Sequence, residues 1–222
     1  MKPIVHKTYS WVLYVFFILF FLFTFLLISF SFKVLGFTRL QILIISLASL
    51  LGSSVNIPVA KLKSKVPIMI IKAYRFFGIE FYVPFYSYED VTVAVNLGGA
   101  LVPVLASSYL ILAHLSLWPS FLLSTLLVTL FVHLLAKPVK GVGIVTPFFL
   151  PPILAALVGL ALGGSMAPVV AYVSGTLGAL IGADLLNLNK IDKLGSSFVS
   201  IGGAGVFDGV FLTGLVAALL AL

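Results

Sequence analysis

The chain has 222 residues, of which 62% are hydrophobic and 9% are charged, and its mean hydropathy is +1.27. A soluble domain is about half apolar and about a quarter charged, so the composition excludes an ordinary water-soluble protein and predicts an integral membrane protein. The absence of cysteine excludes disulfides and cysteine-bound metals. The net charge of +7 is better explained by basic residues in the cytoplasmic loops of a membrane protein than by nucleic-acid binding.

The first apolar run, Trp11–Phe32, follows Lys2 and Lys7. It has about 22 residues, enough to cross a bilayer and more than the apolar core of a signal peptide. We therefore expect a retained first transmembrane helix.

Six further apolar runs predict the remaining helices: Leu40–Val59, Val91–Leu115, Ser120–Ala136, Phe148–Gly163, Ala167–Leu188 and Phe198–Leu222. The predicted fold class is therefore all-α, a polytopic bundle of about seven spans in one integral membrane domain covering residues 1–222. Residues 66–90 are aromatic and too interrupted to span. They are expected to form either an interfacial amphipathic segment or a small hairpin.

The basic residues predict the orientation of these spans. With seven spans, every Lys and Arg except Lys33 and Arg39 falls on one side. Basic loops face the cytoplasm, so we expect a multi-pass protein of the cell membrane with a cytoplasmic N-terminus.

Two parts of the chain are similar to each other. VNLGGALV (95–102) resembles VSIGGAGV (199–206), and LLGSSVNI (50–57) resembles LIGADLLNL (180–188). The two copies keep the same orientation, which is typical of a parallel repeat in a transporter. The alternative is chance similarity, because small residues are common in membrane helices.

In this alignment Asp184 takes the place of Ser54, and Asp208 takes the place of Val104. An ionised carboxylate at the centre of a membrane helix costs ~3 kcal/mol, so it faces the bundle interior, is paired or is protonated. Asparagine residues at similar depth extend this candidate polar site: Asn56, Asn96 and Asn187. Asp184 also fits a second interpretation, as an interfacial residue paired with a nearby lysine.

Gly202, Gly203 and Gly205 come just before Asp208. Glycine permits an extended or broken start to the last helix, which would bring Asp208 into the first turn and towards Asp184. The positive end of the helix dipole would then favour the carboxylate. The alternative is that these glycines only allow close helix packing.

The stretches AYVSGTLGALIGADLLNLNKI and VSIGGAGVFDGVFLTGLVAALLAL resemble a prokaryotic membrane-protein family called domain of unknown function 1614, as do VNLGGALVPVL and FFLPPILAAL. The resemblance covers roughly residues 50–222 and implies no activity. A weaker resemblance is to intramembrane aspartyl proteases of the presenilin and prepilin-peptidase types. These place two Asp residues on adjacent helices, one directly after Gly-x-Gly, whereas here two residues separate Gly205 from Asp208.

Three functions are compatible with these residues. In a membrane aspartyl hydrolase, Asp184 and Asp208 share a proton, activate water and cleave transmembrane segments. In a transporter or ion pathway, Asp208 is the protonatable or cation-binding group. In a scaffold, small-residue faces bind partner helices. We expect no cofactor and no metal, since His114 and His133 are not spaced as a metal pair. The expected partners are the lipid bilayer and no nucleic acid.

Overall fold

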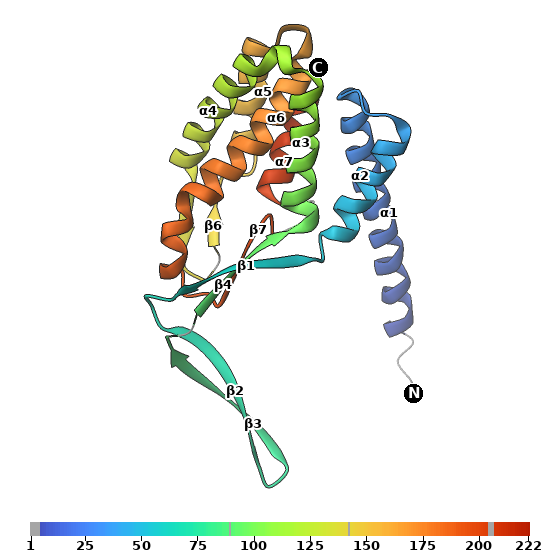
Figure 1. Cartoon of the computed structure of the whole chain (residues 1–222). Coiled ribbons are helices and arrows are strands. Elements are labelled where there is room, and N and C mark those ends of the chain that lie inside the picture. Colours follow the sequence, from blue (N-terminus) through green and yellow to red (C-terminus); the bar gives the residue numbers. More distant parts are fainter. Residues whose placement is uncertain (1–4, 89, 142, 204–206) are drawn as a thin grey trace.

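The computed structural model describes residues 5–88, 90–141, 143–203 and 207–222 (Figure 1). The described chain is mostly helical, with α1 (Val5–Val34), α2 (Arg39–Gly52), α3 (Val102–Ala113), α4 (Trp118–Leu135), α5 (Leu150–Gly163), α6 (Ala167–Ala179) and α7 (Gly209–Leu220). Shorter helical turns are η1 (Leu97–Leu101), η2 (Leu115–Leu117), η3 (Gly164–Met166), η4 (Leu180–Asp184) and η5 (Leu185–Lys193). The strands are β1 (Asn56–Lys63), β2 (Ile68–Phe76), β3 (Ile79–Ser87), β4 (Asp90–Asn96), β5 (Lys137–Val139), β6 (Gly143–Val145) and β7 (Phe198–Ile201).

Helix α6 lies at the centre of the bundle, packed against α3, α4, α5 and α7 (Figure 1). Almost every residue of α6 is buried. Small residues allow these close contacts: a Cβ on Gly159 of α5 would lie 2.5 Å from the Cβ of Ala171. Such contacts stabilise helix pairs in membranes, where lipid is as apolar as the side chains. Larger side chains, including Tyr172 and Phe211, fill the core between α6, α7 and α1.

Three described stretches are long and apolar enough to cross a membrane: Trp11–Val34, Leu115–Leu135 and Leu150–Lys193. In the last stretch the chain reverses at Gly164, whose φ is +54°, so α5 and α6 lie side by side (Figure 1). Helices α2 and α7 have 14 and 12 residues, or ~21 and ~18 Å, less than a ~30 Å hydrocarbon layer. These helices are compatible with a membrane protein, but seven full spans are not confirmed.

A three-stranded sheet lies at one end of the bundle, in the order β1-β4-β7. The predictions of helix at 56–59, 91–96 and 198–201 are therefore wrong, and the fold is not all-α. The physical reason is the sequence VTVAV in β4, which is rich in β-branched residues that prefer a pleated surface. Antiparallel pairing with β1 and parallel pairing with β7 satisfy the backbone groups of β4.

The predicted repeat is only partly visible in the fold. Strand β4 leads through Gly98 and Gly99 to a helix, and β7 leads through Gly202 and Gly203 towards α7. The two strands are parallel neighbours, with Val95 opposite Ile201. The preceding segments differ, because α2 is followed by a strand whereas α6 continues into η4 and η5.

Residues 68–87 form the β2–β3 hairpin, which extends away from the helices (Figure 1). Of the two predicted alternatives for this region, the structure contains the hairpin. Phe77, at its tip, has a φ of +49° and is 91% exposed. An ion pair of 3.3 Å between Arg75 and Glu80 lies next to the tip.

Candidate functional site: two carboxylates on one cavity

Asp184 lies where the helical backbone changes its hydrogen-bonding pattern. The α-helix α6 becomes the π-helix η4, which ends at Asp184, and then tightens into the 3-10 helix η5. A π-helical turn inside a helix is rare and is frequent at functional sites, because it widens the helix and changes the direction of the following side chain. The partly buried Asp184 carboxylate faces the cavity described below.

Asp208 is the N-cap residue of α7. Its φ and ψ of −70° and 150° are extended, and its Oδ1 accepts a hydrogen bond of 2.9 Å from the backbone N–H of Val210. Aspartate is among the residues preferred at this position, because its oxygen satisfies a backbone donor that the helix leaves unpaired. The carboxylate therefore lies at the positive end of the α7 dipole, as the sequence predicts.

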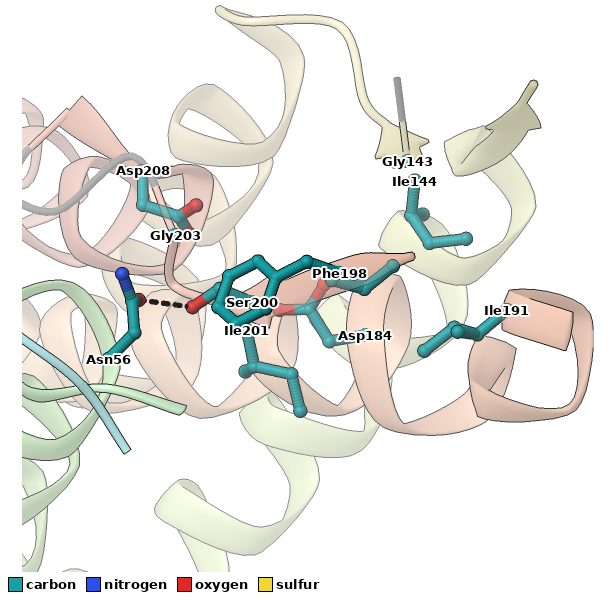
Figure 2. A pocket seen from close by; sticks show the side chains of 11 residues that line it. Asn56, Gly143, Ile144, Asp184, Ile191, Phe198, Ser200, Ile201, Gly203 and Asp208 are labelled. Carbon is teal, nitrogen blue, oxygen red and sulfur yellow. Dashed lines mark hydrogen bonds between the residues drawn. The ribbon is translucent and has the colours of Figure 1, made fainter. Parts of the chain in front are cut away.

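The structure brings Asp184 and Asp208 to one cavity of about 380 Å³ (Figure 2). The rest of the lining comes mainly from β7 and β6, together with Asn56 and Ile191. In Figure 2, Phe198, Ser200 and Ile201 of β7 run along this cavity. Two side chains 24 positions apart in the sequence thus open on the same space.

A second, smaller cavity of about 60 Å³ also touches both carboxylates. It lies among the helices and is lined by residues of α4 to α7, including Thr213, and by Thr146. Asp184 and Asp208 therefore lie between a larger and a smaller cavity. The volume of the smaller cavity is sufficient for a water molecule, which needs roughly 10–15 Å³ of accessible volume and polar partners.

Asn56 and Asn96 join the strands beside the cavity. The Nδ2 of the buried Asn96 donates to Asn56 Oδ1 at 3.0 Å and to the carbonyl oxygen of Ser53 at 2.8 Å. Ser200 Oγ donates to the same Asn56 oxygen, which connects β1 to β7 (Figure 2). Asn56 lines the cavity, whereas Asn96 caps η1 through the N–H of Gly99. We assign a structural role to Asn96.

Asn187 stabilises the segment that carries Asp184. Its Nδ2 donates to the carbonyl oxygens of Gly182 at 3.1 Å and Ala183 at 2.8 Å, and its Oδ1 accepts from Lys190 at 2.6 Å. His133 Nδ1 lies 3.1 Å from the same Gly182 oxygen, a contact in which Nδ1 is the donor. The sequence interpretation considered this histidine only as a metal ligand and missed this contact, because α4 and η4 meet only in the folded chain.

The glycines before α7 break the chain direction as predicted. Gly202 has a φ of +69°, and a Cβ there would lie 2.7 Å from the backbone nitrogen of Ala100, so only glycine fits. Gly203 lines the cavity and donates its N–H to Ser200 O at 3.0 Å. Gly205, also predicted to line the site, lies outside the described residues.

A family model described as "Protein of unknown function (DUF1614)" matches residues 50–220. The chain belongs to this family. The matched region contains both carboxylates and every residue that lines the larger cavity, whereas α1 and most of α2 lie outside it. No curated protein and no solved structure matches the chain. Because the DUF1614 description names no activity, the function has to be argued from the geometry of the site.

Proposed function

We propose that this protein is an intramembrane aspartyl hydrolase that cleaves transmembrane polypeptide segments, with Asp184 and Asp208 as its catalytic residues. The observation that carries this proposal is the convergence of both carboxylates on one cavity. The convergence depends on two separate local features, the π-helical turn at Asp184 and the glycine turn before α7.

The chemistry follows from two acids that line the same cavity. Neighbouring carboxylates share one proton, because two adjacent negative charges repel each other. The ionised group removes a proton from water, and the protonated group donates its proton to the carbonyl oxygen or to the leaving nitrogen. The smaller cavity between the helices supports this role, since it offers space for that water next to both carboxylates.

The open edge of strand β7, which lines the larger cavity, supports a polypeptide substrate. Strand β7 is at the end of the strand order β1-β4-β7, so one of its edges has no partner strand among the described residues. An open edge can accept an extended peptide by main-chain hydrogen bonds. A substrate segment paired with β7 would pass along Phe198 to Ile201, beside both carboxylates.

We further propose that the sheet end of the molecule faces the cytoplasm in the cell membrane. The basic residues of the strands, of the connections between them and of η5 gather there: Lys61, Lys63, Lys65, Lys72, Arg75, Lys137, Lys140, Lys190 and Lys193. Positive charge of this kind marks the cytoplasmic side. Strand β1 is largely exposed, which requires water rather than hydrocarbon around its backbone.

The test is a comparison of membrane-protein fragments in cells that carry Asp184→Asn, Asp208→Asn or the matched control Asp90→Asn. Asparagine is also a good N-cap, so Asp208→Asn removes the charge while keeping the start of α7. Asp90 is exposed and does not line the cavity. We expect cleavage products to disappear with both site variants and to persist with the control. Unchanged fragments with either site variant would contradict the proposal.

A second function, an ion or proton pathway, is supported by the extension of the polar space past Asp208 to Thr213. Beyond Thr213, however, Ala217 and Ala221 pack in an apolar cluster with α4 and α5. This apolar cluster beyond the polar space favours a hydrolytic site over a pathway through the bundle. Purified protein in vesicles distinguishes the two: flux that is lost in Asp208→Asn, with fragments unchanged, indicates transport. If the protein is a scaffold, neither the fragments nor the flux should change in the Asp184→Asn and Asp208→Asn variants.

A further inference from the structure

We propose that the groove between α1 and α2 binds an anionic phospholipid, with an acyl chain along the groove and the phosphate held by Lys33 and Arg39. This site lies at the opposite end of the molecule from the three-stranded sheet (Figure 1). It goes beyond the proposed hydrolase and does not depend on it.

The walls of the groove are apolar and follow helical spacing. Phe25, Leu26 and Phe30 come from one face of α1, and Ile42 and Leu43 come from the facing side of α2. The groove is an open surface depression of about 500 Å³, within the range of roughly 300–1,000 Å³ that small-molecule sites occupy. Its surface is therefore suited to a hydrocarbon chain.

Two cations lie at the polar end of this groove. Lys33 is in the last turn of α1, and Arg39 is the first residue of α2. The two ion pairs found in the described part of the chain, Lys65–Asp192 and Arg75–Glu80, involve neither of them. Every described side-chain carboxylate belongs to the hairpin, to the sheet or to the cavity region, so among the described residues no acidic side chain lines the groove beside these two cations.

The position of Arg39 strengthens this argument. A helix N-terminus is electropositive and favours acidic residues, yet the first turn of α2 contains an arginine and no acid. Thr38 and Gln41 form a capping box that satisfies only some of the backbone donors there. A phosphate at this point would neutralise both side chains and the helix end, which is the common use of such termini.

The expected position of the groove relative to the bilayer favours a lipid over free phosphate as the ligand. The apolar stretch Trp11–Val34 is long enough to span a bilayer, so Lys33 at its end lies at the level of the headgroups. From there the groove runs along both helices into the hydrocarbon layer. An amphiphile with one anionic head and one apolar tail fits both parts.

The experiment is a native mass spectrometry titration of the purified full chain with phosphatidylglycerol. The variant Lys33→Gln/Arg39→Gln should bind about tenfold more weakly, because each basic residue near an anionic lipid contributes on the order of 1 kcal/mol. The matched control Lys61→Gln/Lys63→Gln removes the same charge from exposed positions of β1 and should bind as the wild type does. Phosphatidylcholine, which has no net charge, should bind weakly to all three.

A third variant tests the groove itself. Leu43→Trp fills the apolar wall and leaves both cations, so it should also lose phosphatidylglycerol. Size-exclusion elution identifies variants that fail to fold, and the single variant Arg39→Gln then replaces the double one. Equal binding by the wild type and the cation variant would overturn the proposal, as would an equal loss in the β1 control. Displacement of the lipid by millimolar inorganic phosphate would indicate a site for phosphate alone and would also overturn it.

Discussion

Gly182→Ala is the substitution that tests most directly how Asp184 is positioned. Gly182 lies in η4, two residues before Asp184, where η4 touches α4. A Cβ at this position would lie 2.5 Å from the carbonyl oxygen of Thr129 and 3.1 Å from the backbone nitrogen of His133. Both are backbone atoms, so no side-chain rotation relieves the contact.

The size of the effect follows from these distances. An ordinary contact of about 3.4 Å requires η4 and α4 to separate by nearly 1 Å. Overpacking of this kind costs ~1–3 kcal/mol. For a chain of this size each kcal/mol lowers the melting temperature by about 2–4 °C, so we expect a decrease of roughly 2–12 °C. Because the two carboxylates of the proposed catalytic pair would have to keep their geometry, the proposed cleavage should fall by more than stability does.

The assay is thermal unfolding of the purified protein in detergent, followed by tryptophan fluorescence. The control is Gly209→Ala, whose Cβ would meet only Thr146 Oγ1, at an ordinary 3.7 Å. If Gly182→Ala unfolds at the wild-type temperature, or if Gly209→Ala is lowered equally, the close approach of η4 to α4 does not determine stability and our reasoning is refuted.

Three further predictions use the same measurement. Asp208→Ala should cost about 1 kcal/mol because α7 loses its cap, whereas Asp208→Asn should unfold near the wild-type temperature; equal losses would contradict the capping role. Asn187→Ala should cost ~1–3 kcal/mol, since two carbonyl oxygens lose a buried donor; a change within error would show that these bonds contribute nothing net. Gly98→Ala should be more destabilising than Gly182→Ala, because its Cβ would overlap the Ser49 carbonyl oxygen of α2; a smaller effect would mean that α2 moves freely.

The sequence was sufficient to predict the long helices and the family. Trp11–Phe32 falls within α1, and the predicted Ser120–Ala136 and Phe148–Gly163 overlap α4 and α5 closely. These segments are long apolar runs, and their length is itself the signal for a membrane helix. The family resemblance, based on the motifs around both carboxylates, is confirmed by the match over residues 50–220.

The strands could not be separated from helices in the same way. A short buried strand and one turn of a buried helix are both continuous apolar runs, so periodicity does not distinguish β4 or β7 from the helices that follow them. Composition did contain a signal, because Val and Thr dominate Asp90–Asn96. An interpretation of residues 90–96 as a strand would have predicted a later start, and therefore a shorter helix, than the expected Val91–Leu115.

The surroundings of the two carboxylates could be predicted only in part from the sequence. Glycine spacing predicted the turn before Asp208, because a positive φ at Gly202 has a local cause. The contact of His133 with the carbonyl oxygen of Gly182, and the close approach of the α4 backbone to Gly182, arise from packing of η4 against α4. Such contacts join residues roughly fifty positions apart, and no local pattern encodes them.

The parallel pairing of β4 with β7 also has a consequence for how the protein matures. The two strands are roughly a hundred residues apart, so their pairing requires a long loop to close, a slow event that comes late in folding. Asp208 follows β7 and reaches the cavity only when that pairing has formed. A newly made chain with α1 to α6 in the membrane would therefore carry Asp184 without its partner. If the two carboxylates form the proposed catalytic pair, the protein would be inactive towards other nascent membrane proteins until the sheet closes.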